Sequence, residues 1–352
     1  MQRRRRLSTP SRSTCMHDDL RASAQATPLS FAKAINAALG RALAEMPETI
    51  LYGEDLAKPG GVFGVTRNLQ DQAGKVRVFD TPISETAMLG AAVGAAMTGL
   101  RPIVEIMWID FSLVAMDQIV NQAANVRYVS AGRLGAPLTI RTQQGATPGS
   151  CAQHSQNLEA LYAHIPGLRV GIPATAQDAY SMLLAAIRCD DPTLVIESRG
   201  LYHLDEQPVF LDGPIENAEG AHIVRDGSDV TIVTWGAMLA QALAAADELL
   251  VHGVRAEVIN ARWIAPFDWA TLFESVHRTR CLLVVHEANV SGGFGAEIAA
   301  RVGVEMFGHL VAPVARVGVD DCRMPAAPHL QQVLIPDATR IVAQARRLAR
   351  IM

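Results

Sequence analysis

Apolar residues recur along this chain with two alternating spacings, which predicts a protein built from alternating strands and helices. Residues 29–46 carry an apolar side chain at every fourth position and are followed by Pro47, the pattern of an amphipathic helix. Residues 49–52 form a short apolar run before Gly53, which predicts a strand. Residues 84–98 predict a helix of mostly small side chains, and such a helix is expected to be buried in the middle of a sheet–helix layer.

The same alternation continues to about residue 197. Strands are predicted over residues 49–52, 76–79, 103–107, 137–141, 168–172 and 193–197, and helices over 29–46, 84–98, 116–130, 157–164 and 176–188. Strands that alternate with helices form a parallel, doubly wound sheet. Its ligands are expected beyond the carboxyl ends of the strands.

A second, smaller α/β unit follows a segment without clear periodicity. Residues 200–227 are rich in proline, glycine and acidic side chains. Beyond them, strands are predicted over 230–234, 255–259 and 281–285, and helices over 238–251, 269–277, 294–307 and 337–350. The predicted organisation is a tail at 1–28, a first domain at 29–205, a linker at 206–221 and a second domain at 222–352.

Composition narrows the class of protein. The chain has 352 residues, 49% hydrophobic and 19% charged, which suffices for two cores. The net charge of −4 gives no reason to expect a nucleic acid or an anionic membrane as partner. No apolar run reaches the roughly 18 residues of a membrane-spanning helix. The five cysteines are far apart, so we expect no disulfide framework and a cytoplasmic protein.

Residues 1–28 differ from the rest of the chain. Four consecutive arginines at positions 3–6 precede serines and threonines, and Asp18 and Asp19 follow. There is no apolar segment for secretion, and the acidic residues argue against a transit peptide. The composition predicts a disordered tail, or an upstream start codon chosen over Met16.

Glu85 is the first candidate for chemistry. It enters the small-residue helix in its first turn, after Ser84 and Pro82. The ordinary interpretation is a surface carboxylate that interacts with the helix dipole. However, almost every residue that follows is apolar, so we expect a buried carboxyl that can share a proton with a basic ring nitrogen.

Three other features have both structural and functional interpretations. His154 follows a glycine-containing loop, where it is either a structural side chain or an acid/base group. Phe111, taken alone, reads as a core residue. The sequence Gly292-Gly-Phe-Gly295 is not G-x-G-x-x-G, so it favours a tight strand-to-helix turn over dinucleotide binding by an oxidoreductase.

Nine short blocks in order carry a resemblance over about 300 residues. They are Tyr52-Gly-Glu-Asp55, Gly60-Gly-Val-Phe63, Arg77-Val-Phe-Asp-Thr-Pro-Ile-Ser-Glu85, Met116-Asp-Gln-Ile119, Ala152-Gln-His-Ser-Gln156, His164-Ile-Pro-Gly167, His286-Glu-Ala288, Gly292-Gly-Phe-Gly-Ala-Glu297 and Ile335-Pro-Asp337. From residue 29 onward the chain resembles the β subunit of the decarboxylating, thiamine-diphosphate-dependent component of 2-oxo acid dehydrogenase complexes, which is transketolase-like.

The resemblance implies roles for four residues. Glu85 aligns with the glutamate that hydrogen-bonds the aminopyrimidine of thiamine diphosphate and promotes its imino tautomer. Phe111 aligns with an aromatic residue packed against that ring, and Glu54 with a glutamate near the thiazolium. His154 aligns with a histidine implicated in acyl transfer to lipoamide. The implied fold is a pyrimidine-binding domain followed by a transketolase C-terminal-like domain.

The resemblance also implies partners. The G-D-G motif that usually holds Mg²⁺ on the diphosphate does not occur in this chain. Thiamine diphosphate is therefore expected to be shared with an α subunit, which would hold the Mg²⁺ in an α2β2 heterotetramer. The second domain would form the β–β contact and part of the surface for the lipoyl acyltransferase core.

A structural monovalent cation such as K⁺ is common in the resembled family. The matching positions here are Ala136, Leu138, Thr139, Ala186, Cys189 and Asp191. Cys189 stands where relatives carry an aspartate. A second departure is Asp321-Cys-Arg-Met-Pro325, where many relatives read D-x-P-x-P, and we assign it no catalytic role.

The substrate stays open at this point. The leading hypothesis is oxidative decarboxylation of pyruvate or a branched-chain 2-oxo acid, with acyl transfer to lipoamide. An acetoin dehydrogenase β subunit is the alternative, because Ile109-Asp-Phe111 and residues 152–155 suit both pyruvate and acetoin members. Thr234-Trp-Gly236 and His286-Glu-Ala288 lean toward branched-chain members. A non-catalytic scaffold of the same fold is the third possibility.

Overall fold

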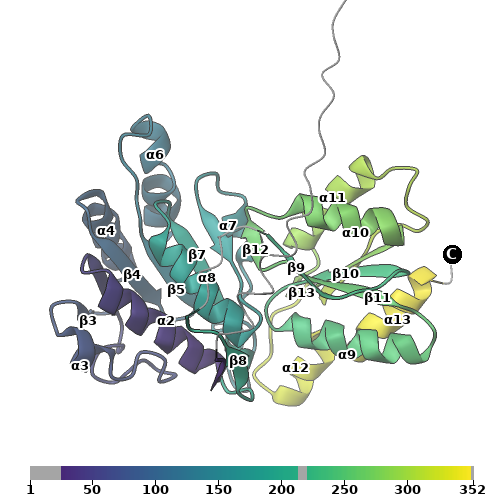
Figure 1. Ribbon diagram of the computed structural model, residues 1–352, viewed down its shortest axis with the longest axis horizontal. Coiled ribbons are helices and arrows are strands. Elements are labelled where there is room, and N and C mark those ends of the chain that lie inside the picture. Colours follow the sequence, from purple (N-terminus) through teal and green to yellow (C-terminus); the bar gives the residue numbers. More distant parts are fainter. Residues whose placement is uncertain (1–24, 213–219, 350–352) are drawn as a thin grey trace, which may run out of the picture.

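Two α/β units lie side by side in the computed structural model, which describes residues 25–212 and 220–349 (Figure 1). Most of the predicted tail at 1–28 therefore lies outside the described residues. Within the described residues no helix is long and apolar enough to cross a membrane.

The first unit is built on a seven-stranded sheet in the order β12-β6-β7-β5-β4-β2-β3. Its bounds are β2 Thr49–Gly53, β3 Val78–Asp80, β4 Arg101–Ile106, β5 Thr139–Gln144, β6 Arg169–Gly171, β7 Thr193–Ser198 and β12 Trp263–Ala265. All neighbouring strands pair in parallel except β12, which is antiparallel to β6. The prediction of a doubly wound parallel sheet is confirmed.

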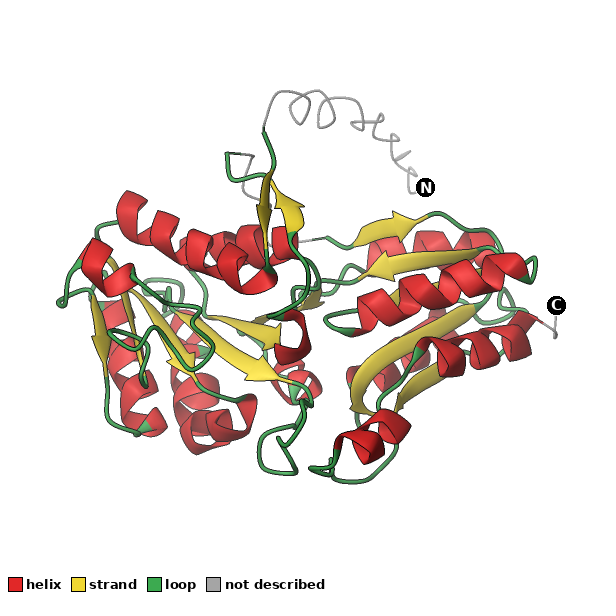
Figure 2. Cartoon of the chain, turned by 90° about the horizontal axis from the view of Figure 1, so that it is seen from below, coloured by secondary structure: helices red, strands yellow, loops and turns green. Residues whose placement is uncertain are grey.

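Helices cover both faces of this sheet (Figure 2). The helical segments of the unit are α2 Phe31–Glu45, α3 Leu69–Ala73, α4 Glu85–Met97, α5 Ile109–Ser112, η1 Leu113–Ala115, η2 Gln118–Ala123, α6 Val126–Val129, α7 Glu159–Ala163, α8 Ala176–Arg188 and η3 Arg199–Leu201. α8 begins with a capping box, in which the Thr175 side chain accepts from Asp178 N–H and the Asp178 carboxylate accepts from Thr175 N–H.

Two helix predictions need correction. The helix expected over 116–130 is not one regular α-helix, because Gln118–Ala123 winds as a π-helix and Ala124 N–H bonds Ile119 O at 3.1 Å. α4 is buried on one face only: Met88, Leu89 and Ala92 lie in the core, whereas the opposite face is exposed in this chain. On that second face, Thr86 bonds Val114 O and Gly90 lies beside Gln118, whereas a Cβ on Gly94 would meet no described atom within 4 Å.

The second unit has a five-stranded sheet in the order β14-β13-β10-β11-β9, parallel except at β9. Its strands are β9 His222–Arg225, β10 Val230–Thr234, β11 Ala256–Asn260, β13 Leu282–Asn289 and β14 Ala315–Val319, and its helices are α9 Met238–Val251, α10 Trp269–Thr279, α11 Phe294–Glu305, α12 Pro328–Leu334 and α13 Ala338–Ala349. The second α/β unit is thus confirmed, with β9, β14 and α12 as additions.

Two strand pairings cross the predicted boundaries. β1 (Thr27–Leu29) pairs antiparallel with β8 (Gln207–Val209), so the last residues of the predicted tail and the first of the predicted linker form a ladder. Backbone pairing between distant segments overrides their turn-like composition. In addition, β12 follows β11 in sequence but completes the edge of the first sheet, beside α7 at the junction of the two units (Figure 1).

Candidate active site

The predicted site residues gather at one edge of the first sheet. Glu54 follows β2, Glu85 opens the helix after β3, Phe111 lies in the segment after β4, and His154 lies in the loop after β5. Because these strands are parallel neighbours, their carboxyl ends deliver all four segments to the same edge. The topology that was predicted from the alternation therefore explains why they lie on the same side of the molecule.

Two carboxyl groups lie close together at this edge. Glu85 is only 7% exposed, which confirms the expected burial, and no hydrogen bond to its carboxylate is found among the described residues. Burial raises the pKa of Glu54, and the negative charge of Glu85 raises it further. The pair therefore favours a ligand that brings a proton or a positive charge.

Backbone contacts hold the loops that carry these carboxyls. The Asp80 carboxylate accepts from Ala57 N–H at 2.7 Å, and Gly53 O accepts from Thr81 N–H at 2.9 Å. The loop after β2 and the segment before α4 are thereby fixed against each other. The Thr86 hydroxyl donates to Val114 O at 2.7 Å, which ties the first turn of α4 to the segment that follows Phe111.

His154 lies between two aromatic side chains. Its ring centroid is 4.7 Å from that of Trp108 and 5.5 Å from that of Phe111, both edge-to-face. Trp108 has φ +66°, a strained value for a bulky residue, and its N–H donates to the Gln143 side chain at 3.1 Å. The structure thus brings Phe111 and His154 together and adds Trp108 to the site. Its strained backbone marks Trp108 as unusual, and that strain is not visible in the sequence.

Arg199, which follows β7, was missed by sequence reasoning. Its guanidinium lies over the Trp108 ring at 5.4 Å from the centroid and donates to the carbonyls of Gly145 and His154. Burial lowers its pKa, while Asp110 and Glu287 oppose that shift. The position of Arg199, a charged residue directly after a buried strand, was the sequence feature that could have indicated its role.

Beneath the edge, a charged network occupies the centre of the sheet. Arg141 of β5 is fully buried and bonds Glu105 of β4 at 2.6 Å and Glu197 of β7 at 2.8 and 2.9 Å. Burial alone would lower the pKa of Arg141, but Glu197 and Glu105 together raise it. Tyr202 donates to Glu197 and completes the set. Such a network holds three neighbouring strands in one register.

The six positions of the expected cation site fall in two segments: Ala136, Leu138 and Thr139 lie before and at the start of β5, and Ala186, Cys189 and Asp191 lie at and after the end of α8. Leu138 N–H donates to Ala136 O at 2.7 Å, and Leu138 O accepts from Thr193 N–H at 3.0 Å. Cys189 O accepts from the Arg101 guanidinium at 3.0 Å, and the Cys189 thiol accepts from Asp191 N–H at 3.4 Å. A carbonyl that accepts one hydrogen bond keeps a second lone pair with which it can bind a cation. These contacts are therefore compatible with a cation, which stays a prediction.

At the second sheet, the carboxyl edge is filled by side chains. His286 is fully buried and stacks on Trp235 at 5.5 Å, and the indole N–H of Trp235 donates to Glu159 at 3.1 Å. A Cβ on Gly295 would lie 2.6 Å from His286 Nε2. The glycine pattern at 292–295 therefore forms the predicted strand-to-helix turn and also admits the imidazole.

Comparisons with known proteins agree with this geometry. Residues 27–204 match the family "Transketolase, pyrimidine binding domain", and residues 219–341 match "Transketolase, C-terminal domain". A solved split-gene transketolase, an inactive β4 tetramer, superposes with a TM-score of 0.72 at 23% identity, covering 92% of this chain and 99% of that one, which shows the fold. The class is a two-domain, transketolase-like protein.

Closer relatives identify the family within that class. The chain is 42% identical to the pyruvate dehydrogenase E1 component subunit β-2 of Oryza sativa, over 92% of this chain and 87% of that one. It is also 42% identical to the β subunit of acetoin:2,6-dichlorophenolindophenol oxidoreductase of Cupriavidus necator, over 92% and 98%. The chain belongs to the E1 β subunits of the pyruvate and acetoin dehydrogenase type, as the resemblance implied.

Membership of this family indicates a cofactor and a partner. A transketolase pyrimidine-binding domain implies thiamine diphosphate as cofactor, and the chain's own residues fit the ring: Glu85 is a buried carboxylate with no donor of its own among the described residues. E1 β subunits typically pair with an α subunit. The two relatives are named for different substrates, pyruvate and acetoin.

Proposed function

We propose that this chain is the β subunit of a 2-oxo acid dehydrogenase component, with pyruvate or a branched-chain 2-oxo acid as substrate. It would act in an α2β2 heterotetramer, in which the α subunit holds the diphosphate and Mg²⁺, and would pass the acyl group to a lipoyl acyltransferase. The observation that carries the proposal is Glu85, a buried carboxylate beside Glu54 on the edge that also holds Phe111 and His154.

Glu85 is proposed to hold a proton on the aminopyrimidine ring. A carboxyl this buried interacts strongly with a ring nitrogen because little water competes for it. Glu54 is proposed to lie near the thiazolium, since its carboxyl has a raised pKa beside Glu85 and gains from a nearby positive charge. When bound, thiamine diphosphate supplies the electron sink for decarboxylation.

Phe111 and His154 are proposed to serve the two ends of the reaction. Phe111 is partly buried and packs on the core, so it offers a fixed flat face to the pyrimidine. His154 lies at a loop end between two aromatic rings, where an imidazole can exchange a proton with an incoming thiol.

For the cation, we propose K⁺ at the six backbone positions named above. An activity that requires K⁺ and is not restored by Li⁺ would support that site.

The main test removes the proton-holding group. The chain is mixed with its α partner, thiamine diphosphate and Mg²⁺, and decarboxylation is measured for wild type and Glu85→Gln. We expect the variant to lose roughly 10²–10⁴-fold in kcat, the usual contribution of acid–base catalysis. Asp71→Asn is the matched control, because Asp71 is an exposed carboxylate in the first turn of α3. A Glu85→Gln rate equal to that of the control would refute the assignment.

Acetoin is the second candidate substrate, favoured by the acetoin:2,6-dichlorophenolindophenol oxidoreductase subunit that matches over 98% of its length. Turnover of pyruvate, 2-oxoisovalerate and acetoin by the same assembled complex separates the candidates. A kcat/KM for acetoin above those of both 2-oxo acids would replace the leading proposal while leaving the role of Glu85 intact.

A further inference from the structure

The loop that carries His154 is held by the second domain. Glu287, in β13, accepts a hydrogen bond from Ala146 N–H at 2.8 Å. Gln331 of α12 donates to Thr147 O at 3.0 Å, and Gly149 N–H donates to Ala326 O at 3.1 Å. The loop after β5 therefore takes its shape from a part of the chain more than 140 residues away in sequence.

One peptide group in this loop is fixed from both sides. Glu287 accepts from the N–H of Ala146, and Arg199 donates to the C=O of Gly145, which belongs to the same peptide. The Arg199 guanidinium also donates to the carbonyl of His154 itself. A continuous chain of hydrogen bonds thus runs from Glu287 through the Gly145–Ala146 peptide and Arg199 to the backbone of His154.

The glycine at this peptide provides a second, independent observation. Gly145 has φ +91°, and a Cβ there would lie 3.0 and 3.2 Å from the two oxygens of Glu287. Only a glycine allows both the backbone conformation and the close approach of the carboxylate. The loop and the glutamate are therefore fitted to each other.

We propose that Glu287 is a positioning residue that sets the place of His154 across the domain interface. The inference depends on the proposed function, because it assumes that His154 serves acyl transfer. Glu287 touches neither the cofactor nor the substrate in this assignment. It acts through the Gly145–Ala146 peptide and Arg199.

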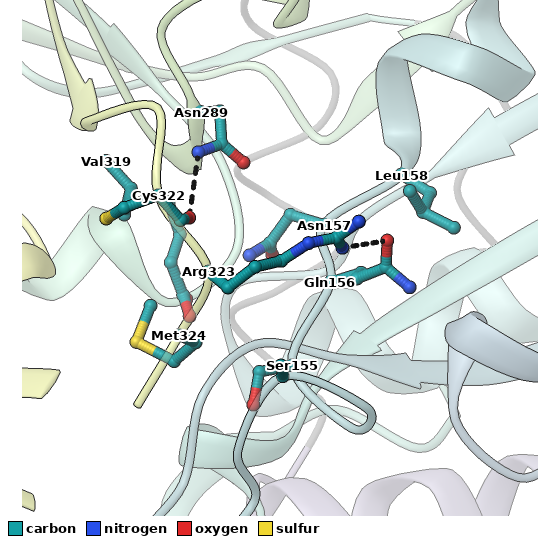
Figure 3. Close-up of a pocket in the computed structure, with 11 residues that line it drawn as sticks. Ser155, Gln156, Asn157, Leu158, Asn289, Val319, Cys322, Arg323 and Met324 are labelled. Carbon is teal, nitrogen blue, oxygen red and sulfur yellow. Dashed lines mark hydrogen bonds between the residues drawn. The ribbon is translucent and has the colours of Figure 1, made fainter. Parts of the chain in front are cut away.

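The surroundings of Glu287 suit this role. Burial raises its pKa, while the Ala146 N–H and the charge of Arg199 favour the ionised form. It lines a small cavity of about 70 Å³ with Ser155 and Arg323. From the same domain, the Arg323 guanidinium donates to the Gln156 side chain at 3.0 Å (Figure 3), so a further contact supports the end of the loop.

The test separates acyl transfer from decarboxylation. The assembled α–β complex with thiamine diphosphate and Mg²⁺ is assayed with 2,6-dichlorophenolindophenol as acceptor and, separately, with a lipoyl domain. For Glu287→Ala we expect lipoyl acylation to fall about 10–100-fold more than dye reduction, because the loop shift displaces His154. Glu257→Ala is the matched control: Glu257 is a buried carboxylate of the same sheet that pairs with Arg278 instead of the loop.

Two further variants make the result decisive. Glu287→Gln keeps an oxygen acceptor for Ala146 N–H and should recover most of the acylation rate, whereas an equal loss in both variants overturns the hydrogen bond as the link. Adding Glu287→Ala to His154→Ala should cause less than a roughly twofold further loss of acylation, since residues that act as one unit are not additive. If the alanine variant fails to assemble, Glu287→Asp is assayed in its place, because it withdraws the acceptor by one methylene.

The outcomes distinguish the inference from the proposed function. If His154→Ala leaves lipoyl acylation unchanged, the proposed role of His154 fails. If His154→Ala lowers acylation but Glu287→Ala changes both assays as the Glu257→Ala control does, then the positioning role is wrong and the proposed function stands.

Discussion

The carboxyl edges of the two parallel sheets differ in what fills them. At the first edge, the segments that follow β2, β4 and β5 carry Glu54, Phe111 and His154 over a sheet whose centre holds a buried arginine. At the second edge, Trp235 and His286 pack against each other among glycines. The same architecture thus gathers the candidate site residues at one edge and packs an aromatic pair into the other. Among the described residues, only the first sheet has a fully buried arginine paired with two buried carboxylates.

The sharpest test of this difference is to break the buried network. Arg141→Met should destabilise the protein by about 3–5 kcal/mol, because Glu105 and Glu197 are left without a cation in the sheet interior. Denaturant unfolding measures the loss. The loss should shrink from pH 8 to pH 5, because burial raises the pKa of Glu197 and its stranded carboxyl can then take up a proton.

The second sheet supplies the control for Arg141. Arg278 pairs there with Glu257 but is 43% exposed, so Arg278→Met should cost only about 1–2 kcal/mol. Equal losses for the two arginines would contradict the view that only the first sheet depends on a buried charge network.

The packing at the carboxyl edge of the second sheet can be tested by adding a methyl group to it. Gly295→Ala should cost about 3 kcal/mol, since its Cβ would lie 2.6 Å from His286 Nε2 and 3.2 Å from Val284. A Cβ on Gly303, in the same helix α11, would meet no neighbouring atom within 4 Å, so Gly303→Ala should be neutral or stabilise by about 1 kcal/mol. Thermal unfolding of the two variants compares them directly, and similar midpoints would refute the close packing.

The smallest expected effect concerns the pH dependence of that edge. Burial lowers the pKa of His286 from 6.5 to about 4. The unfolded chain therefore binds a proton that the folded chain excludes, so stability from this group is present above pH 6.5 and is lost as the pH falls toward 4. Between pH 7.5 and pH 5 the loss should be about 2 kcal/mol. His286→Gln should flatten that part of the stability profile; a profile parallel to wild type would contradict the buried neutral imidazole.

Sequence reasoning predicted the parallel sheets, and through them the shared edge that gathers Glu54, Glu85, Phe111 and His154. It missed β1, β8 and β12 because each is a three-residue segment whose pairing partner lies far away in the chain. Periodicity needs several residues to be visible, whereas a ladder needs only a partner.

The supporting residues of the site were missed for a different reason. Arg199 directly follows β7, and Glu287 lies in β13 just past the strand predicted over 281–285. A single charged residue at either place is ordinarily interpreted as a solvated strand end. Their importance comes from both meeting the Gly145–Ala146 peptide, a coincidence in space that no local pattern encodes. Trp108 was likewise passed over, because its positive φ is a backbone property.

The strand β12 has a consequence for how this protein can be divided. It comes from the second half of the chain but closes the outer border of the first sheet, where it covers β6 and buries Trp263 completely. A fragment that stopped at residue 212 would present the bare rim of β6 and invite other chains to pair with it. Separate expression of the two halves is therefore expected to yield aggregates, and any fusion or gene-splitting experiment should keep Trp263–Ala265 with the first sheet.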